Sequence, residues 1–149
     1  MDGNGNRLKY FQGLAVFPLK TAVRLTNKPM TRTITVLDGV TATDTGNAVN
    51  IAGAKKITIQ CICADHASGN GAFAVSVSND GTNFATYSKL ITNATNTNSQ
   101  TQVRAASLTL SADGSDFVSF SPEDSFKYMK VAVTVTTDGT YTAIANIEE

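Results

Sequence analysis

The chain has 149 residues, of which 16% are charged and 42% are hydrophobic. A chain of this length fits one domain and can bury a full hydrophobic core. Its twelve basic and twelve acidic residues cancel, so no overall field favours nucleic acid or an anionic membrane as a partner. Thr, Ser, Asn, Ala and Val are common, which is typical of short strands joined by polar turns.

No apolar run approaches the ~20 residues of a membrane helix, and residues 14–17 are too short for the core of a signal peptide. We therefore expect a soluble protein made in the cytoplasm without secretion. Cys61 and Cys63 are its only cysteines, and at this spacing in a strand they share a face, where a mutual disulfide would be strained. They are expected to be buried thiols, which suits a reducing compartment.

Residues 1–30 differ in character from the remainder. Their glycines and prolines break any helix, yet their apolar side chains are too frequent for a disordered tail. The sequence predicts an extended N-terminal arm, and leaves open whether it packs on its own domain or on a neighbour. The residues of the arm expected to make contacts with a partner or with another subunit are Arg7, Lys9, Tyr10, Phe11, Val16, Phe17, Lys20 and Arg24.

From residue 31 onward, alternating apolar and polar residues predict about eight short strands. An Asp-Gly pair between two such runs favours a hairpin, because Gly accepts positive φ. The clearest predicted hairpin turns at Asp138-Gly139. The Thr/Asn-rich residues 92–101 are expected to form an exposed loop, and residues 121–124 to start one helical turn. The predicted strands are 33–37, 56–63, 73–77, 84–87, 103–110, 117–120, 128–135 and 141–147.

The lack of amphipathic helices between these strands excludes a parallel α/β architecture. The predicted fold is all-β, with a two-sheet β-sandwich over residues 31–149 and the extended arm over residues 1–30. Both jelly-roll and immunoglobulin-like sandwiches fit the number and spacing of the strands.

Candidate chemical sites are few. His66 is the only histidine, and its polar neighbours follow it along one loop, which is not the convergent geometry of a catalytic triad. Cys61, Cys63, Asp65 and His66 include zinc-ligand types but lack a second, distant pair. Residues 79–83 alternate oxygen-bearing side chains without the closing Glu of a calcium loop, so a turn is expected. The sequence thus predicts no enzyme and no catalytic, cofactor or metal site.

Charge is uneven along the chain. Residues 1–32 carry six basic residues against Asp2, a balance of +5, whereas residues 107–149 carry seven acidic residues against two basic ones, a balance of −5. These two parts can complement each other between neighbouring copies. The basic start lacks the dense Lys/Arg cluster of a nucleic-acid arm, so a protein-docking arm is favoured.

Two segments resemble pieces of phage virion proteins. Residues 75–84, Val-Ser-Val-Ser-Asn-Asp-Gly-Thr-Asn-Phe, resemble a strand-turn-strand of their sandwich modules, and residues 125–133 resemble the strand packed beside it. With the size, the apolar arm and the Thr/Asn-rich sandwich, the chain resembles the decoration, or cement, proteins of tailed double-stranded DNA bacteriophages. The resemblance implies a homotrimer bound to the major capsid protein on the outer surface of the virion. It assigns no residue a role and implies no cofactor.

Other functions remain open at this stage. A carbohydrate- or receptor-binding module of a phage tail or fibre is the alternative, although the chain has no Trp and only four Tyr for a sugar platform. Loops rich in Asn and Asp also bind sugars. A small hydrolase on a sandwich scaffold would lack its base.

Overall fold

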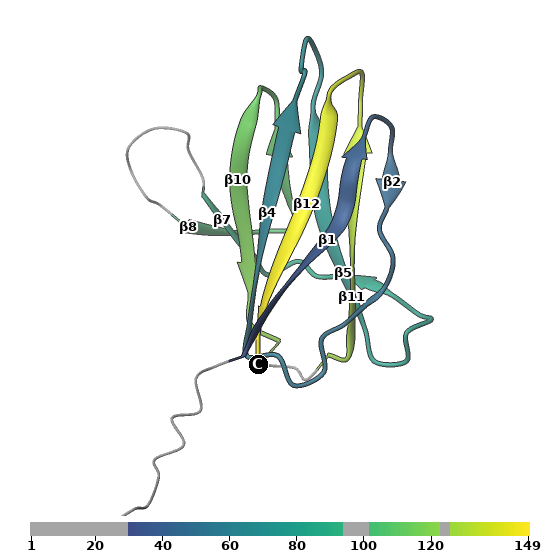
Figure 1. The fold of residues 1–149 in the computed structure, drawn as a ribbon, viewed down its shortest axis with the longest axis vertical. Coiled ribbons are helices and arrows are strands. Elements are labelled where there is room, and N and C mark those ends of the chain that lie inside the picture. The colour runs from purple at the N-terminus through teal and green to yellow at the C-terminus, as the bar shows by residue number, and fades with distance from the viewer. Residues whose placement is uncertain (1–29, 94–101, 123–125) are drawn as a thin grey trace, which may run out of the picture.

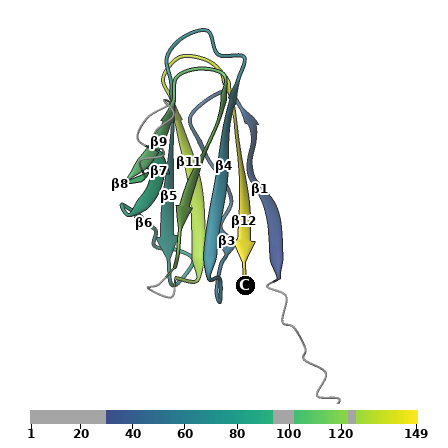
Figure 2. The ribbon, with the colours of Figure 1, turned by 90° about the vertical axis from the view of Figure 1, so that its left-hand side faces the viewer.

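The computed structural model describes residues 30–93, 102–122 and 126–149, which form two antiparallel six-stranded sheets packed face to face (Figures 1 and 2). These residues contain no helix, and therefore none that is long and apolar enough to span a membrane. The predicted all-β sandwich is confirmed.

The first sheet has the spatial order β1 (Thr31–Val40), β12 (Thr140–Glu148), β4 (Lys56–Ala64), β10 (Gly114–Phe120), β7 (Leu90–Asn93) and β8 (Gln102–Ala105). In the second sheet, β11 (Tyr128–Val135) and β5 (Gly71–Ser78) form the centre. The short strands β2 (Asp44–Thr45) and β3 (Val49–Asn50) pair with β11, while β6 (Ala85–Thr86) and β9 (Ser107–Leu110) pair with β5.

The strand pairs are nested. β1 pairs with β12, β2 and β3 with β11, β4 with β10, and β5 with β9. Successive pairs alternate between the two sheets, as in a long hairpin rolled up on itself. This is the jelly roll, which decides between the two predicted sandwich types.

The core lies between the inner faces of the two sheets. Successive side chains of a strand point to opposite faces, so every second residue of β4 and β11 is buried. Cys61 and Cys63 are among these residues and are free thiols, 0% and 2% exposed. Their prediction as buried packing groups is confirmed, and burial raises the pKa of both thiols.

The predicted hairpin at Asp138-Gly139 is wrong, because this turn carries the chain from β11 in the second sheet to β12 in the first. Asp113-Gly114 makes a similar crossing between β9 and β10. Gly139 has φ 105°, and a sheet-to-sheet crossing needs that freedom as much as a hairpin does. The turn around Asp80 does join paired strands, β5 and β6.

Other strand predictions need correction as well. Residues 103–110 form two strands in different sheets, with a bend at Ala106. β7 enters the stretch expected to be an exposed loop, and Thr92 within it is buried. Residues 94–101 of that stretch, and residues 123–125 of the expected helical turn, lie outside the described residues.

Tyr141 and Gly71 fit closely where β12 begins. The buried Tyr141 ring meets Phe73 edge-on with ring centroids 6.0 Å apart, and its hydroxyl donates to the Asp138 carbonyl oxygen at 2.9 Å. Burial raises the pKa of Tyr141 to about 12. A Cβ at Gly71 would overlap the ring, so only glycine lets the chain pass.

We expect Gly71→Ala to lower the free energy of unfolding by about 1–3 kcal/mol, the usual cost of overpacking a core. Urea denaturation measures this change. Asn70→Ala is the matched control, since it alters the adjacent residue without approaching the ring. Equal denaturation midpoints for the Gly71 variant and the wild type would contradict the close fit.

Candidate functional site

The predicted contact arm lies outside the described residues, and so do all eight of its assigned residues: Arg7, Lys9, Tyr10, Phe11, Val16, Phe17, Lys20 and Arg24. The structure does describe where the arm joins the domain. Met30 precedes β1, and its carbonyl oxygen accepts from the Glu149 amide at 2.8 Å. We call this end of the sandwich, with the start of β1 and the end of β12, the lower pole (Figure 1). The opposite end, with the loops after β1, β4, β9 and β11, is the upper pole.

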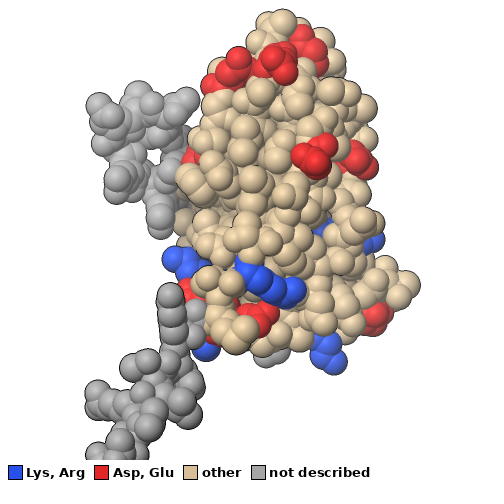
Figure 3. Space-filling view, viewed as in Figure 1, with Lys and Arg blue, Asp and Glu red and all other residues tan. Residues whose placement is uncertain are grey.

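On the face drawn in Figure 3, the charged side chains of the upper pole are acidic, whereas basic and acidic side chains both lie at the lower pole. The upper pole holds Asp65, Asp113 and Asp138, while the described Lys and Arg residues lie toward the lower pole. This arrangement differs from the contrast expected along the sequence. The acidic last third of the chain is divided, because Glu148 and Glu149 lie at the lower pole beside the basic residues.

The upper-pole carboxylates hold loops in place. Asp138 Oδ1 accepts from the amides of Ala67 and Ser68 at 3.2 and 2.9 Å, and these bonds, that of Ser68 most, lower the pKa of Asp138. Asp113 Oδ1 accepts from the His66 amide at 2.8 Å. The His66 ring lies on this loop, with Nε2 3.0 Å from the Gly69 carbonyl oxygen. No group of His, Cys, Asp and Glu side chains within the described ranges could hold a metal ion.

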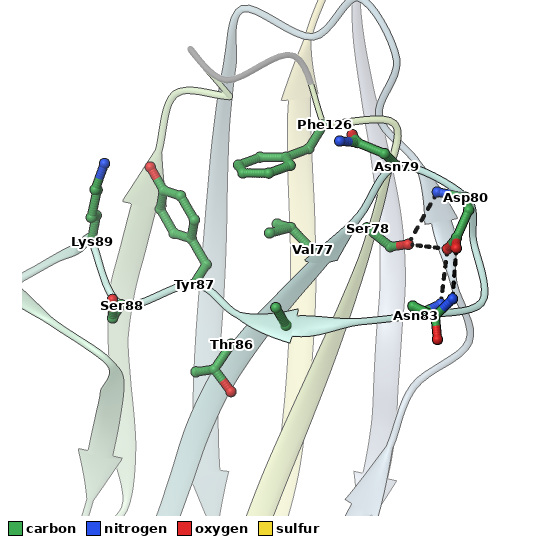
Figure 4. Close-up of a pocket in the computed structure, with 11 residues that line it drawn as sticks. Val77, Ser78, Asn79, Asp80, Asn83, Thr86, Tyr87, Ser88, Lys89 and Phe126 are labelled. Atoms are coloured by element: carbon green, nitrogen blue, oxygen red, sulfur yellow. Dashed lines mark hydrogen bonds between the residues drawn. The ribbon is translucent and has the colours of Figure 1, made fainter.

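The candidate site is a hollow of about 510 Å³ at the lower pole, between the β5–β6 turn and the segment that leads into β7 (Figure 4). We call it the Tyr87 hollow. Its apolar lining comes from Val77, Tyr87 and Phe126, and polar groups surround them. The polar lining includes Asn79, Thr86, Ser88 and Lys89.

The aromatic rings of the Tyr87 hollow are held by packing. Tyr87 stacks in a tilted arrangement on Phe120, with ring centroids 4.9 Å apart, and meets Phe126 edge-on at 5.9 Å. The Tyr87 amide donates to the Val75 carbonyl oxygen at 2.8 Å. Tyr87 and Phe126 are half-buried, so both rings are fixed and still reach the surface of the hollow.

Asp80 organises the turn at one side of the hollow. Its Oδ1 accepts from the Ser78 hydroxyl and from the amides of Thr82 and Asn83, each at 2.8 Å. Its Oδ2 accepts from the Asn83 side-chain amide at 2.7 Å. These bonds, those from Asn83 most, hold the pKa of Asp80 far below its usual range. The prediction of a turn over residues 79–83 is confirmed, and the carboxylate is committed to it.

The side chains of Asn79, Ser88 and Lys89 differ from Asp80, because within the described part of the chain they have no hydrogen-bond or ion-pair partner. The hollow therefore offers ring faces, an amide, a hydroxyl and an ammonium group. This set of groups can bind a ligand. Sequence analysis missed the hollow because its lining comes from three separate segments.

A second hollow, of about 380 Å³, lies between β1 and β3 and is lined partly by Ile34, Val36 and Val49. We call it the edge hollow. β12 pairs with one side of β1, and successive residues of β1 point their backbone N–H and C=O groups alternately toward β12 and away from it. The carbonyl oxygen of Met30 accepts from the Glu149 amide, so Met30 is one of the residues that point toward β12. By that alternation, the amides of Thr31, Thr33 and Thr35 point away from β12, toward an edge on which no described strand pairs. Farther along, Gly46 lies so close to the Val36 carbonyl oxygen that a Cβ would overlap it.

The fold has counterparts among solved structures, although no protein-family model and no curated protein matches the sequence. The structure of YomS, a protein derived from the SPBc2 prophage, is similar with a TM-score of 0.58 at 12% identity, over 81% of this chain and 95% of that one. A VP2 subviral particle of infectious bursal disease virus matches with a TM-score of 0.31 at 14% identity, over 82% of this chain and 41% of that one. At such identities the similarity to YomS concerns the fold alone.

We expect Asp80→Asn to lower the melting temperature at pH 7, because the amide replaces one acceptor oxygen with a donor that faces the Asn83 amide. The pKa of Asp80 is depressed in the folded state, so its carboxylate stabilises the fold at pH values above the unfolded pKa of about 4. The difference in melting temperature between wild type and variant should shrink below that pH and vanish as the pH falls through the folded-state pKa. Calorimetry from pH 7 to pH 2 measures it, with the exposed Asp38→Asn as control; a constant difference would contradict this role of Asp80.

Proposed function

We propose that this protein is a structural component of a phage particle that binds the outside of the capsid as a decoration, or cement, protein. The observation that carries the proposal is the jelly-roll fold shared with a prophage-derived protein over most of both chains. Jelly rolls recur in viral capsids.

The proposed mechanism is stabilisation by mass action. A protein that binds the assembled shell and not its separate subunits stabilises the shell by about 2.7 kcal/mol per site at a hundredfold excess over Kd. Repeated over many sites, this gain opposes the pressure of packaged DNA. A homotrimer, as the resemblance implies, would further increase the affinity by linking several contacts.

The lower pole is the proposed contact surface. The arm joins the domain there beside Glu149, and Thr31, Thr33 and Thr35 of β1 present outward amides next to the edge hollow. An open strand edge is a template for an extended segment of another chain. We propose that a segment of the major capsid protein adds to this edge and covers the apolar wall of the edge hollow. The acidic upper pole then faces solvent.

Deletion of residues 1–28 tests the role of the arm. We expect the truncated protein to keep its β-sheet circular dichroism, because the described core is built from residues 30–149. We also expect it to co-sediment less with purified capsids, since it lacks the predicted contact residues. Loss of the β-sheet signal would mean that the arm belongs to the folding core, and undiminished binding would exclude it from the contact.

Thr33→Pro tests the free edge of β1. Proline removes the outward amide of Thr33 and leaves the bonds to β12 intact, and proline is tolerated on an edge strand in this orientation. We expect about a tenfold loss of capsid affinity, as for one lost backbone hydrogen bond, with little change in melting temperature. Thr33→Ala keeps the amide and is the matched control. Equal capsid affinities for the proline and alanine variants would exclude strand addition at this edge.

A further inference from the structure

We propose that the Tyr87 hollow binds one residue of an acidic saccharide, with the sugar ring against Tyr87 and Phe126 and its carboxylate on Lys89. This activity goes beyond capsid binding and does not depend on it. It would use side chains that line the Tyr87 hollow. Neither the sequence nor the similarity to YomS assigns a role to this site.

The size and depth of the hollow fit such a ligand. Its volume of about 510 Å³ lies within the range of small-molecule sites, about 300–1,000 Å³. The hollow is open at the surface (Figure 4), so one residue of a longer chain can enter while the chain continues into solvent. Val77 closes it from below and is buried in the core.

The aromatic pair gives the hollow its preference for a sugar ring. The face of an aromatic ring carries partial negative charge, and one face of a pyranose presents C–H groups with partial positive charge. Tyr87 and Phe126 are already fixed against each other and against Phe120. Because they need no ordering when a ligand binds, little entropy is lost at these side chains.

Polar groups flank the rings. In Figure 4 the rings of Tyr87 and Phe126 are seen between Lys89 on one side and Asn79 on the other. The side-chain amide of Asn79 both donates and accepts hydrogen bonds, and so does the hydroxyl of Ser88, which also lines the hollow. Such groups match neighbouring sugar hydroxyls, which also do both. A purely apolar ligand would leave them without partners.

Charge selects an acidic sugar over a neutral or a basic one. Lys89 is exposed and has no ion-pair partner among the described residues. The nearby carboxylate of Asp80 already accepts four hydrogen bonds within its turn, so it is not available to bind a cationic group. A carboxylate on the ligand would form a charge-assisted hydrogen bond with the Lys89 ammonium group, which is stronger than a neutral one.

The experiment begins with the full chain on an array of oligosaccharides that contain sialic or uronic acid residues, together with their neutral counterparts. Saturation-transfer NMR and calorimetric titration then follow the best ligand and the same ligand with its carboxyl group reduced to an alcohol. We expect the reduced ligand to bind about tenfold or more weakly, as for loss of a hydrogen bond to a charged group. The sugar ring protons should receive saturation from aromatic protons.

Lys89→Gln should bind the acidic and the reduced ligand equally, because it removes only the charge. Lys130→Gln is the matched control, since its ammonium group lies over the Phe84 ring, 4.4 Å from the centroid, and it does not line the hollow. Phe126→Leu should weaken both ligands while keeping an apolar side chain. If this variant unfolds at a lower temperature, Lys89→Gln still tests the proposal, because its side chain is exposed.

Several outcomes would overturn the proposal. These are an array with no acidic ligand bound, equal affinity of the wild type for acidic and reduced ligands, or an unchanged preference in Lys89→Gln. Capsid co-sedimentation of Lys89→Gln should match that of the wild type, since the proposed capsid contact is the free edge of β1. A failure of glycan binding is thereby distinguished from a failure of the proposed function.

Discussion

The pairing of β1 with β12 is the contact on which the remaining structure depends. It joins the first and last strands of the described chain, Thr31 opposite Glu148, and so closes the outermost pair of the nested hairpin. The pairing brings the start of β1 and the C-terminus to one pole. Since β12 occupies one side of β1, the other side becomes an edge of the first sheet. The place where Met30 joins the domain and the outward amides of β1 therefore follow from one long-range pairing.

Some polar side chains of the fold hold loops in place, while others remain available to bind a ligand. Asp80 lies in the segment whose sequence faintly resembles a calcium loop, whereas Asp113 and Asp138 belong to Asp-Gly pairs between strands. In the structure each accepts hydrogen bonds from backbone amides of a loop, which would otherwise lack partners at the ends of strands. The polar side chains that remain available, such as Lys89 and Asn79, surround an aromatic hollow. The loop carboxylates therefore stabilise the fold, while the groups around the hollow remain able to bind a ligand.

The long strands could be predicted from sequence because their period of two is repeated over eight or more residues, as in β4, β5 and β11. β2, β3 and β6 contain two residues each, too few to establish any period. The pairing of strands was harder to predict, because an Asp-Gly turn supplies positive φ without specifying which sheet the chain enters next. In the Tyr87 hollow, Val77 and Tyr87 come from the local β5–β6 hairpin, whereas Phe126 is added by the long-range pairing of β5 with β11.

The edges of the two sheets differ in how they are protected, and this difference bears on function. In the second sheet, the short strands β2 and β3 form one edge, and β6 and β9 form the other. Short edge strands limit continuous pairing with another chain. β1 has ten residues. Gly46 approaches it at the Val36 carbonyl oxygen, and residues 47–50 line the edge hollow beside it. The first half of β1 carries neither Lys nor Pro, and Arg32 there is engaged by Glu149 and the Asn50 carbonyl oxygen. A regular edge of this kind can pair with an extended segment of another chain, and it begins next to Met30, which the Glu149 amide binds.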